Sequence, residues 1–177
     1  MRRLALILSC TLLLLTSCQS QKTPQGIAVE VKRVVSGQTI EVINPQTPTV
    51  VEKVRLQGID APDWRQKPWS VIAKARLEEL LANSNSQELA PSLVFLEIES
   101  QHKDRYGRYL AYVWHNNALV NEQLVRDGSV LVTENITPDQ YTQRLTHAQE
   151  YARLMGLGIW HPEKPMSLTP QEFRAQN

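Results

Sequence analysis

Apolar and polar residues alternate along three consecutive stretches that begin near Ile27. These stretches read IAVEVKRVV, QTIEVIN and VVEKVRLQ, and the turn residues Ser36-Gly37 and Asn44-Pro45 separate them. An alternation with a period of two is typical of strands that bury one face, and all three stretches are rich in β-branched residues. We therefore predict three consecutive antiparallel strands between Ile27 and Gln57.

The hydrophobic period then changes to that of a helix, as apolar residues from Val71 to Leu81 recur at helical spacing. Strand periodicity returns twice, and two further helical stretches follow. One of these ends at Gly128, a typical residue after a helix end, and the other starts near Pro138. The predicted elements are strands over 91–100 and 108–116 and helices over 69–81, 120–128 and 138–155. Beyond Pro162 the chain loses its periodicity.

Five short strands, with one helix between the third and the fourth and further helices after the fifth, match a small closed antiparallel barrel of the OB type. The pattern alone also fits an unspecified α+β domain. The four tryptophans are expected to be core or half-buried packing residues, because apolar elements surround most of them. They are Trp64, Trp69, Trp114 and Trp160.

The N-terminus has a different pattern, in which Arg2 and Arg3 precede an unbroken apolar run over Leu4–Leu15. A basic start, an apolar stretch and the small residues Thr16 and Ser17 are typical of a secretory signal. The run is shorter than the ~20 residues that a membrane-spanning helix needs. We therefore predict export from a bacterial cytoplasm and removal of the leader.

The stretch Leu15-Thr16-Ser17-Cys18 resembles the bacterial lipobox. This resemblance implies that residues 1–17 are a lipoprotein signal peptide and that Cys18 becomes the lipidated first residue. Residues 18–26 would then be a lipidated, flexible spacer. Since two or more acyl chains bind a membrane stably, the protein would be anchored at the inner or outer membrane of the cell envelope, facing the periplasm or the exterior. A plain signal peptide that leaves Cys18 free is the alternative.

Composition limits the partners of the mature chain, whose 160 residues suit one compact domain. Loss of residues 1–17 lowers the Lys and Arg count from 19 to 17, against 18 acidic residues. No overall basic field then attracts nucleic acid, so any binding of a polyanion needs a local basic cluster. With Cys10 removed and Cys18 acylated, we expect no disulfide, and we expect a monomer.

Four short segments concentrate glycine, charged and turn residues at predicted strand ends. They read SGQT (36–39), RLQGIDAPD (55–63), DRYGR (104–108) and VNEQLVRDG (120–128). In order and spacing they resemble the staphylococcal nuclease, or thermonuclease, family over about Ile27 to Trp160. The resemblance implies a mainly β fold with a five-stranded OB barrel and about three helices over 27–162, followed by a tail over 163–177. It also implies calcium-assisted hydrolysis of phosphodiester bonds in DNA or RNA.

The resemblance assigns roles to four residues. Arg55 and Arg108 match the two arginines that bind the phosphate, which suits the planar fork of a guanidinium group. Asp60 matches a metal-binding aspartate. Asp63 stands where the family has the glutamate proposed as general base, and it is one methylene shorter. The acid is retained but its reach is reduced.

The first segment departs from the family, which has Asp-Gly-Asp-Thr where this chain has Ser36-Gly37-Gln38-Thr39. Gln38 replaces an anionic calcium ligand with a neutral amide oxygen, so Asp60 and Gln38 would form only a weak Ca²⁺ site. Arg105 and Tyr106 match a basic and aromatic pair that binds nucleotide. A tyrosine ring can stack on a base.

These residues also have simpler interpretations. Arg55 and Asp60 can form a purely structural salt bridge, and Asp63 can serve only to turn the chain. We expect Asn121 or Glu122 to make hydrogen bonds that attach a helix to the barrel, without any catalytic role.

The leading hypothesis is a calcium-assisted nuclease at the cell envelope, with weakened or altered activity. The alternative is a non-catalytic OB-fold module on a lipid anchor, which binds nucleic acid or an envelope partner.

Overall fold

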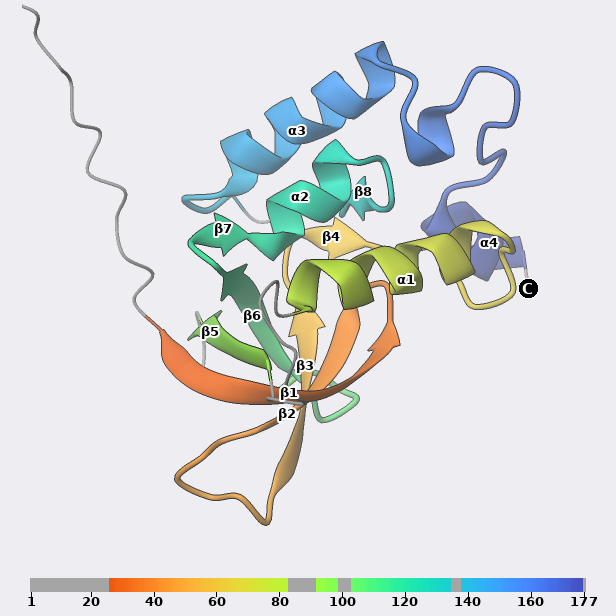
Figure 1. The fold of residues 1–177 in the computed structure, drawn as a ribbon. Helices are drawn as coiled ribbons and strands as arrows, with labels where there is room; N and C mark the ends of the chain where they lie inside the picture. The colour runs from red at the N-terminus through yellow and green to blue at the C-terminus, as the bar shows by residue number, and fades with distance from the viewer. Residues whose placement is uncertain (1–25, 83–91, 99–102, 135–137, 177) are drawn as a thin grey trace, which may run out of the picture.

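A closed five-stranded barrel forms the centre of the protein (Figure 1). The computed structural model describes residues 26–82, 92–98, 103–134 and 138–176, so the leader and Cys18 lie outside the described residues. The neighbours in the order β3-β2-β1-β5-β6 are antiparallel, and β3 pairs in parallel with β6 to close the barrel. The strands are β1 (Ile27–Ser36), β2 (Thr39–Ile43), β3 (Val51–Leu56), β5 (Ser92–Ile98) and β6 (Tyr109–His115).

Three two-residue strands complete the β structure of the described residues. Strand β7 (Ala118–Leu119) pairs with β6, whereas β4 (Ile59–Asp60) and β8 (Leu131–Val132) form a separate small sheet. In that sheet Asp60 lies opposite Leu131. The polar segment after β3 is therefore held in extended form beside the barrel.

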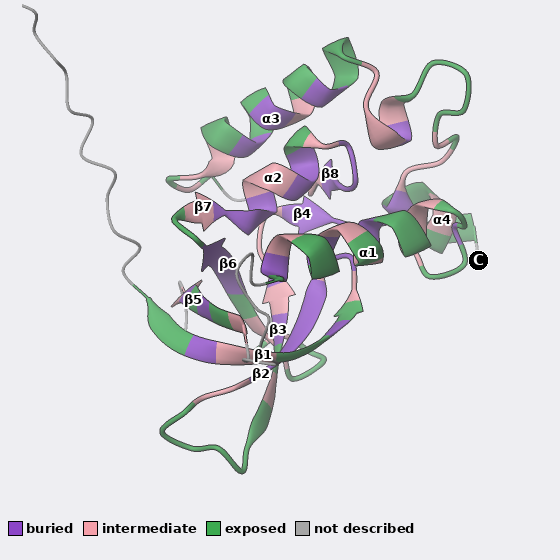
Figure 2. Cartoon of the chain, viewed as in Figure 1, coloured by how far each residue is buried: buried purple, intermediate pink, exposed green. Residues whose placement is uncertain are grey.

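Helices α1, α2 and α3 are stacked on one end of the barrel, with α3 farthest from it (Figure 1). The helices are α1 (Trp69–Leu81), α2 (Val120–Arg126), α3 (Thr142–Leu154) and α4 (Pro170–Gln176), with a short 3₁₀ helix at Gly158–Trp160. Figure 2 shows that α2 is mostly buried or half-buried, whereas the outer face of α3 and the loop between β2 and β3 are exposed. Within the described ranges, no helix is both long and apolar enough to cross a bilayer.

The five barrel strands and the helices α1 and α2 occur in the order that the sequence predicted. The predicted OB-type barrel is confirmed. Two details differ. The barrel is mixed rather than fully antiparallel, because β3 and β6 run in the same direction where the sheet closes. The third helix begins at Thr142 instead of near Pro138, since the Asp139 carboxylate accepts the N–H groups of Tyr141 and Thr142 and holds that segment as a turn.

The tail contains a fourth helix, α4, where the sequence pattern indicated no regular structure. Thr169 and Glu172 bond reciprocally across its start: the Thr169 N–H donates to Glu172 Oε2 (2.7 Å) and the Glu172 N–H donates to Thr169 Oγ1 (3.2 Å). This is a capping box, and Pro170 suits the first helical position. The helix is therefore specified by its capping residues rather than by an apolar period.

The packing prediction is wrong for Trp64, which is 75% exposed, and holds for the other three tryptophans. Trp64 lies in the loop between β4 and α1, where the Arg65 guanidinium is 5.8 Å from its ring centroid. An aromatic ring can therefore remain at the surface against a cation instead of entering the core.

Asn121 connects α2 to the barrel, as predicted. Its side chain is fully buried; Oδ1 accepts the Val113 N–H (2.9 Å), and Nδ2 donates to the Gln57 carbonyl (2.8 Å). One amide thus satisfies two backbone groups, one of strand β6 and one just beyond β3. The helical layer and the two strands that close the barrel depend on the same side chain.

Replacement of this amide should be costly. Asn121→Ala leaves the two backbone groups without their partner, and we expect it to lower the free energy of unfolding by about 2–4 kcal/mol. Urea unfolding measures the change, with Gln123→Ala, a half-exposed position of the same helix, as the matched control. Equal loss in both variants would show that Asn121 has no special role.

Candidate active site

Tight packing of the turn between β1 and β2 positions one side of the site. A Cβ atom at Gly37 would lie 2.6 Å from the Cβ of Ala73 in α1, so only glycine allows this approach. The next residue, Gln38, accepts the Leu56 N–H with its main-chain carbonyl at 2.9 Å. The turn is therefore attached both to α1 and to the end of β3.

Arg55 extends from β3 toward this turn and is largely buried. It pairs across the strands with Thr39 of β2, and its Nη1 donates to the Leu56 carbonyl at 3.0 Å. Its Nη2 lies 3.6 Å from Asp60 Oδ1, and the Arg55 side chain is only 15% exposed. The guanidinium group is therefore held between the barrel end and the small sheet.

Arg55 is the centre of a charged cluster. Burial lowers the pKa of Arg55 to about 10; Asp60 and Asp104 oppose this shift, and Arg108 and Arg174 add to it. The group remains protonated at neutral pH. Three guanidinium groups thus surround two carboxylates, which leaves the local excess of positive charge that an anionic phosphate requires. The sequence indicated that any such attraction must be local.

Arg108 precedes β6 and is oriented by Asp104. Its Nε and Nη2 contact Asp104 Oδ2 at 2.9 and 2.7 Å, and its Nη1 donates to Thr39 Oγ1 at 3.5 Å. Burial raises the pKa of Asp104, but the hydrogen bonds from Arg108 and from the Tyr106 N–H outweigh it, so the net pKa is lowered. The charged carboxylate thereby fixes the guanidinium group.

Thr39 brings the two predicted arginines into one site, because it is the cross-strand partner of Arg55 and a hydrogen-bond acceptor for Arg108. Asp104 was not selected from the sequence as a site residue. The sequence signal that could have found it is the spacing of four residues between Asp104 and Arg108, with a glycine between them, which brings an acid and a base of one tight loop close together.

Asp60 lies between two guanidinium groups. It is 9% exposed, and its Oδ2 accepts a hydrogen bond from Arg174 Nη2 at 2.6 Å while its Oδ1 faces Arg55. Arg174 belongs to α4 and was missed from the sequence. The capping box of α4 could have predicted the helix, but nothing in the sequence indicates that it docks against Asp60.

Gln38 and Asp60, the two predicted metal ligands, are close to each other but already engaged. Gln38 Oε1 accepts the Ala61 N–H at 2.6 Å, and guanidinium groups face both oxygens of Asp60. Among the described residues, no group of three or more His, Cys, Asp or Glu side chains could hold a metal ion. Calcium needs six to eight oxygen ligands, so the residues in this arrangement do not fit it.

Asp63 turns the chain, as its simpler interpretation predicted. Its Oδ1 accepts the Arg65 N–H at 3.1 Å and Arg65 Nε at 2.9 Å, and its own N–H donates to Gln66 Oε1. The hydrogen bond from Arg65 holds the pKa of Asp63 below its usual range. The carboxylate is charged at neutral pH but is a weakened base, and its catalytic role stays a prediction.

Arg105 and Tyr106 lie at the rim of the arginine cluster. The Tyr106 ring is 64% exposed, and its centroid is 4.8 Å from the Arg105 guanidinium carbon and 5.1 Å from that of Arg108. The structure therefore brings this predicted pair next to Arg108, where an exposed ring is available for stacking.

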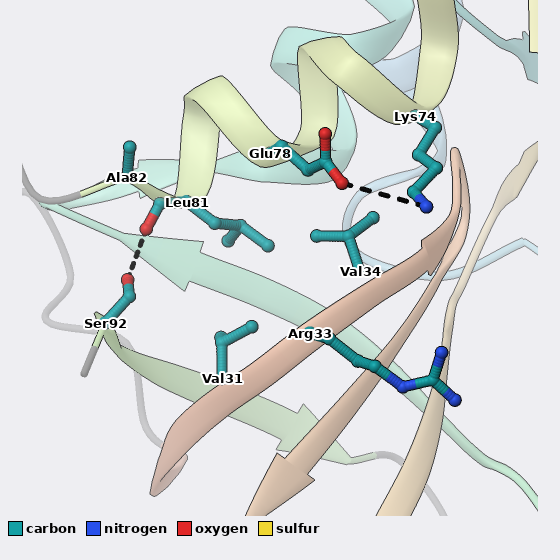
Figure 3. Close-up of a pocket in the computed structure, with 8 residues that line it drawn as sticks. All are labelled: Val31, Arg33, Val34, Lys74, Glu78, Leu81, Ala82 and Ser92. Carbon is teal, nitrogen blue, oxygen red and sulfur yellow. Dashed lines mark hydrogen bonds and ion pairs between the residues drawn. The ribbon is translucent and has the colours of Figure 1, made fainter. Parts of the chain in front are cut away.

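A hollow of about 420 Å³ lies between α1 and β1, apart from the arginine cluster (Figure 3). Val31, Val34 and Leu81 supply apolar walls. Its charged residues are paired, Lys74 with Glu78 inside it and Arg33 with Glu41 of β2. Since this hollow offers no converging arginines and no unpaired acid, the cluster around Arg55 is the better candidate site.

The closed barrel and its helices define the class of small OB-fold proteins, here with a cluster of arginines at one end of the barrel. Residues 53–162 match the family model described as staphylococcal nuclease homologue. The chain belongs to this family.

Relatives with nuclease names cover most of the chain. It is 32% identical over 142 residues to the thermonuclease of Staphylococcus intermedius, and the aligned region covers 80% of this chain and 81% of the relative. It is 31% identical over 131 residues to the thermonuclease of Staphylococcus hyicus, with 74% of each chain covered. An uncharacterized endonuclease of Haemophilus influenzae is 27% identical over 171 residues, covering 96% of this chain and 85% of the relative.

Proposed function

We propose that this protein is a nuclease that hydrolyses phosphodiester bonds of DNA or RNA. The observation that carries this proposal is the convergence of Arg55 and Arg108 on Thr39, at the end of a staphylococcal nuclease-type barrel. The names of the relatives support the same activity.

The two arginines have complementary tasks in this mechanism. Arg55, buried and fixed by the Leu56 carbonyl, binds the non-bridging oxygens of the scissile phosphate. Arg108, oriented by Asp104, stabilises the negative charge that builds up in the transition state. Tyr106 at the rim supports the neighbouring base or sugar.

Asp63 is the candidate general base. A carboxylate can take a proton from the attacking water, but the hydrogen bond from Arg65 lowers the pKa of Asp63 and so its basicity. A slow enzyme is the expected result. Calcium dependence is an expectation from the family, and because Gln38 and Asp60 are engaged elsewhere, we assign no step of the reaction to calcium.

The second candidate function is a non-catalytic module that binds nucleic acid or an envelope partner. The same engaged residues favour it: Asp63 is bonded to Arg65, Asp60 to Arg174 and Gln38 to Ala61. Both functions use the arginine cluster, and a module that binds nucleic acid differs from the nuclease only in that it does not cleave its ligand.

Substitution of Arg55 tests the proposed enzyme. Arg55→Met should lower kcat by about 100-fold or more, because it removes a charge that the transition state needs. The free energy of unfolding should change by less than about 1 kcal/mol, since the cost of burying the guanidinium group disappears and Asp60 retains Arg174. Cleavage of labelled single-stranded DNA and of RNA, each with calcium and with EDTA, measures activity, and urea unfolding measures stability.

Arg153→Met, an exposed arginine of α3, is the control for Arg55. Unchanged turnover in a folded Arg55→Met protein would remove Arg55 from the site. Absence of cleavage by the wild-type chain under all conditions would leave the binding module as the function.

The pH dependence tests Asp63. Asp63→Asn should abolish cleavage, whereas Arg65→Gln should raise the pKa of Asp63 by removing its hydrogen bond. A base acts in its deprotonated form, so the acid limb of the pH profile of kcat/KM should move to higher pH in Arg65→Gln. Superimposable acid limbs in wild type and Arg65→Gln would exclude Asp63 as the base.

We further propose that the enzyme acts at the cell envelope, anchored by a lipid on Cys18. The lipobox-like sequence before Cys18 is the support. Cys18→Ser should release the protein from the membrane fraction, and mass spectrometry of the wild-type N-terminal peptide should show the acyl chains. An unmodified Cys18 in membrane-bound protein would contradict the anchor.

A further inference from the structure

Helix α4 brings the end of the chain back to the arginine cluster. It lies beside the N-terminal end of α1 (Figure 1), where Gln66 Nε2 donates to the Leu168 carbonyl at 2.9 Å. The Arg65 guanidinium carbon is 5.2 Å from the Phe173 ring centroid, and Pro170 is buried. Contacts other than the one through Arg174 therefore hold α4 in place.

Arg174 in the last turn of α4 makes the shortest ionic contact of Asp60 in the described residues. Its Nη2 is 2.6 Å from Asp60 Oδ2, against 3.6 Å between Arg55 Nη2 and Asp60 Oδ1. The Arg174 side chain remains 43% exposed. Since a guanidinium group has five N–H donors, one side can bind Asp60 while donors on the open side remain for an anion.

The charge balance around Asp60 is already complete without a metal ion. A buried carboxylate requires a positive partner, and here Arg174 and Arg55 both supply one. A divalent cation at Asp60 would meet repulsion from both guanidinium groups and would have to displace Arg174. The resemblance to the family implies calcium at Asp60, whereas two guanidinium groups already neutralise this carboxylate. The contacts of Arg174 and Arg55 are therefore the structural reason why calcium does not fit here.

We propose that Arg174 takes the place of the divalent cation: it is a third phosphate-binding guanidinium group, and the arginine cluster binds the phosphodiester of a nucleic acid without a metal. The proposal rests on the proposed function for the identity of the ligand. Arg174 carries a fixed positive charge to the position of Asp60, the carboxylate that Arg55 also faces.

Binding without turnover provides the first test. Fluorescence anisotropy of the purified full chain with a labelled single-stranded DNA oligonucleotide in EDTA measures affinity. Arg174→Gln should weaken binding about tenfold or more, the value of a charge-assisted hydrogen bond to phosphate. It should also reduce the salt slope by about one. Arg174→Lys should retain part of the affinity, because it keeps the charge but not the fork.

Lys164→Gln is the matched control, since it removes one exposed positive charge from the same tail at a distance in sequence from α4. It should bind like the wild type. A merely structural role of Arg174 would lower the unfolding midpoint and leave the salt slope unchanged, and this outcome overturns the proposal. Equal losses in Arg174→Lys and Arg174→Gln overturn it as well.

Calcium provides the second test. Replacing EDTA with calcium should change the affinity of the wild type by less than about twofold, which is within 0.5 kcal/mol. A calcium requirement for binding overturns the proposal. Tighter binding or faster cleavage by Arg174→Gln would also overturn it, because Arg174 would then obstruct the binding of nucleic acid at the arginine cluster. A wild-type chain that binds but never cleaves refutes the proposed nuclease and leaves the binding tests of Arg174 valid.

Discussion

This site depends on the neutralisation of one buried carboxylate, Asp60, by two arginines. Asp60 lies in a two-residue strand beside the barrel, and it is tolerated there because Arg55 and Arg174 reach it from two distant parts of the chain. An unpaired charge at this depth would cost several kcal/mol. The short strand β4, the end of β3 and the C-terminal helix are therefore linked through one ionic group.

Barrel closure provides the second constraint. The parallel pairing of β3 with β6 brings the start of β6 beside β3, and the antiparallel pairing of β2 with β3 sets Thr39 opposite Arg55. Arg108 reaches the same threonine because Asp104 holds its guanidinium group. Two arginines that are far apart in sequence thus meet at a rigid barrel end, and this fixed placement would reduce the entropy cost of holding the phosphate of the proposed substrate.

The same packing holds the arginine pair in this chain although other positions depart from the pattern that the family resemblance implies. Gln38, in place of an acid, no longer needs a metal and instead accepts the Ala61 N–H. Asp63 supports a turn with Arg65, and α4 supplies a cation from within the chain. Each of these contacts gives a polar group a partner within the chain. The barrel therefore forms without the metal ligands that the family resemblance implies.

The sequence by itself determined the five barrel strands and the helices α1 and α2, because periodicity is a local property of the chain. Its resemblance to the nuclease family singled out Arg55 and Arg108 but not Arg174. The sequence did not determine the exposed position of Trp64, the parallel closure, or the contact of Arg174 with Asp60. That ionic contact joins residues 114 positions apart. Only the tertiary structure decides which charged group neutralises a buried carboxylate, because this depends on where separate elements dock.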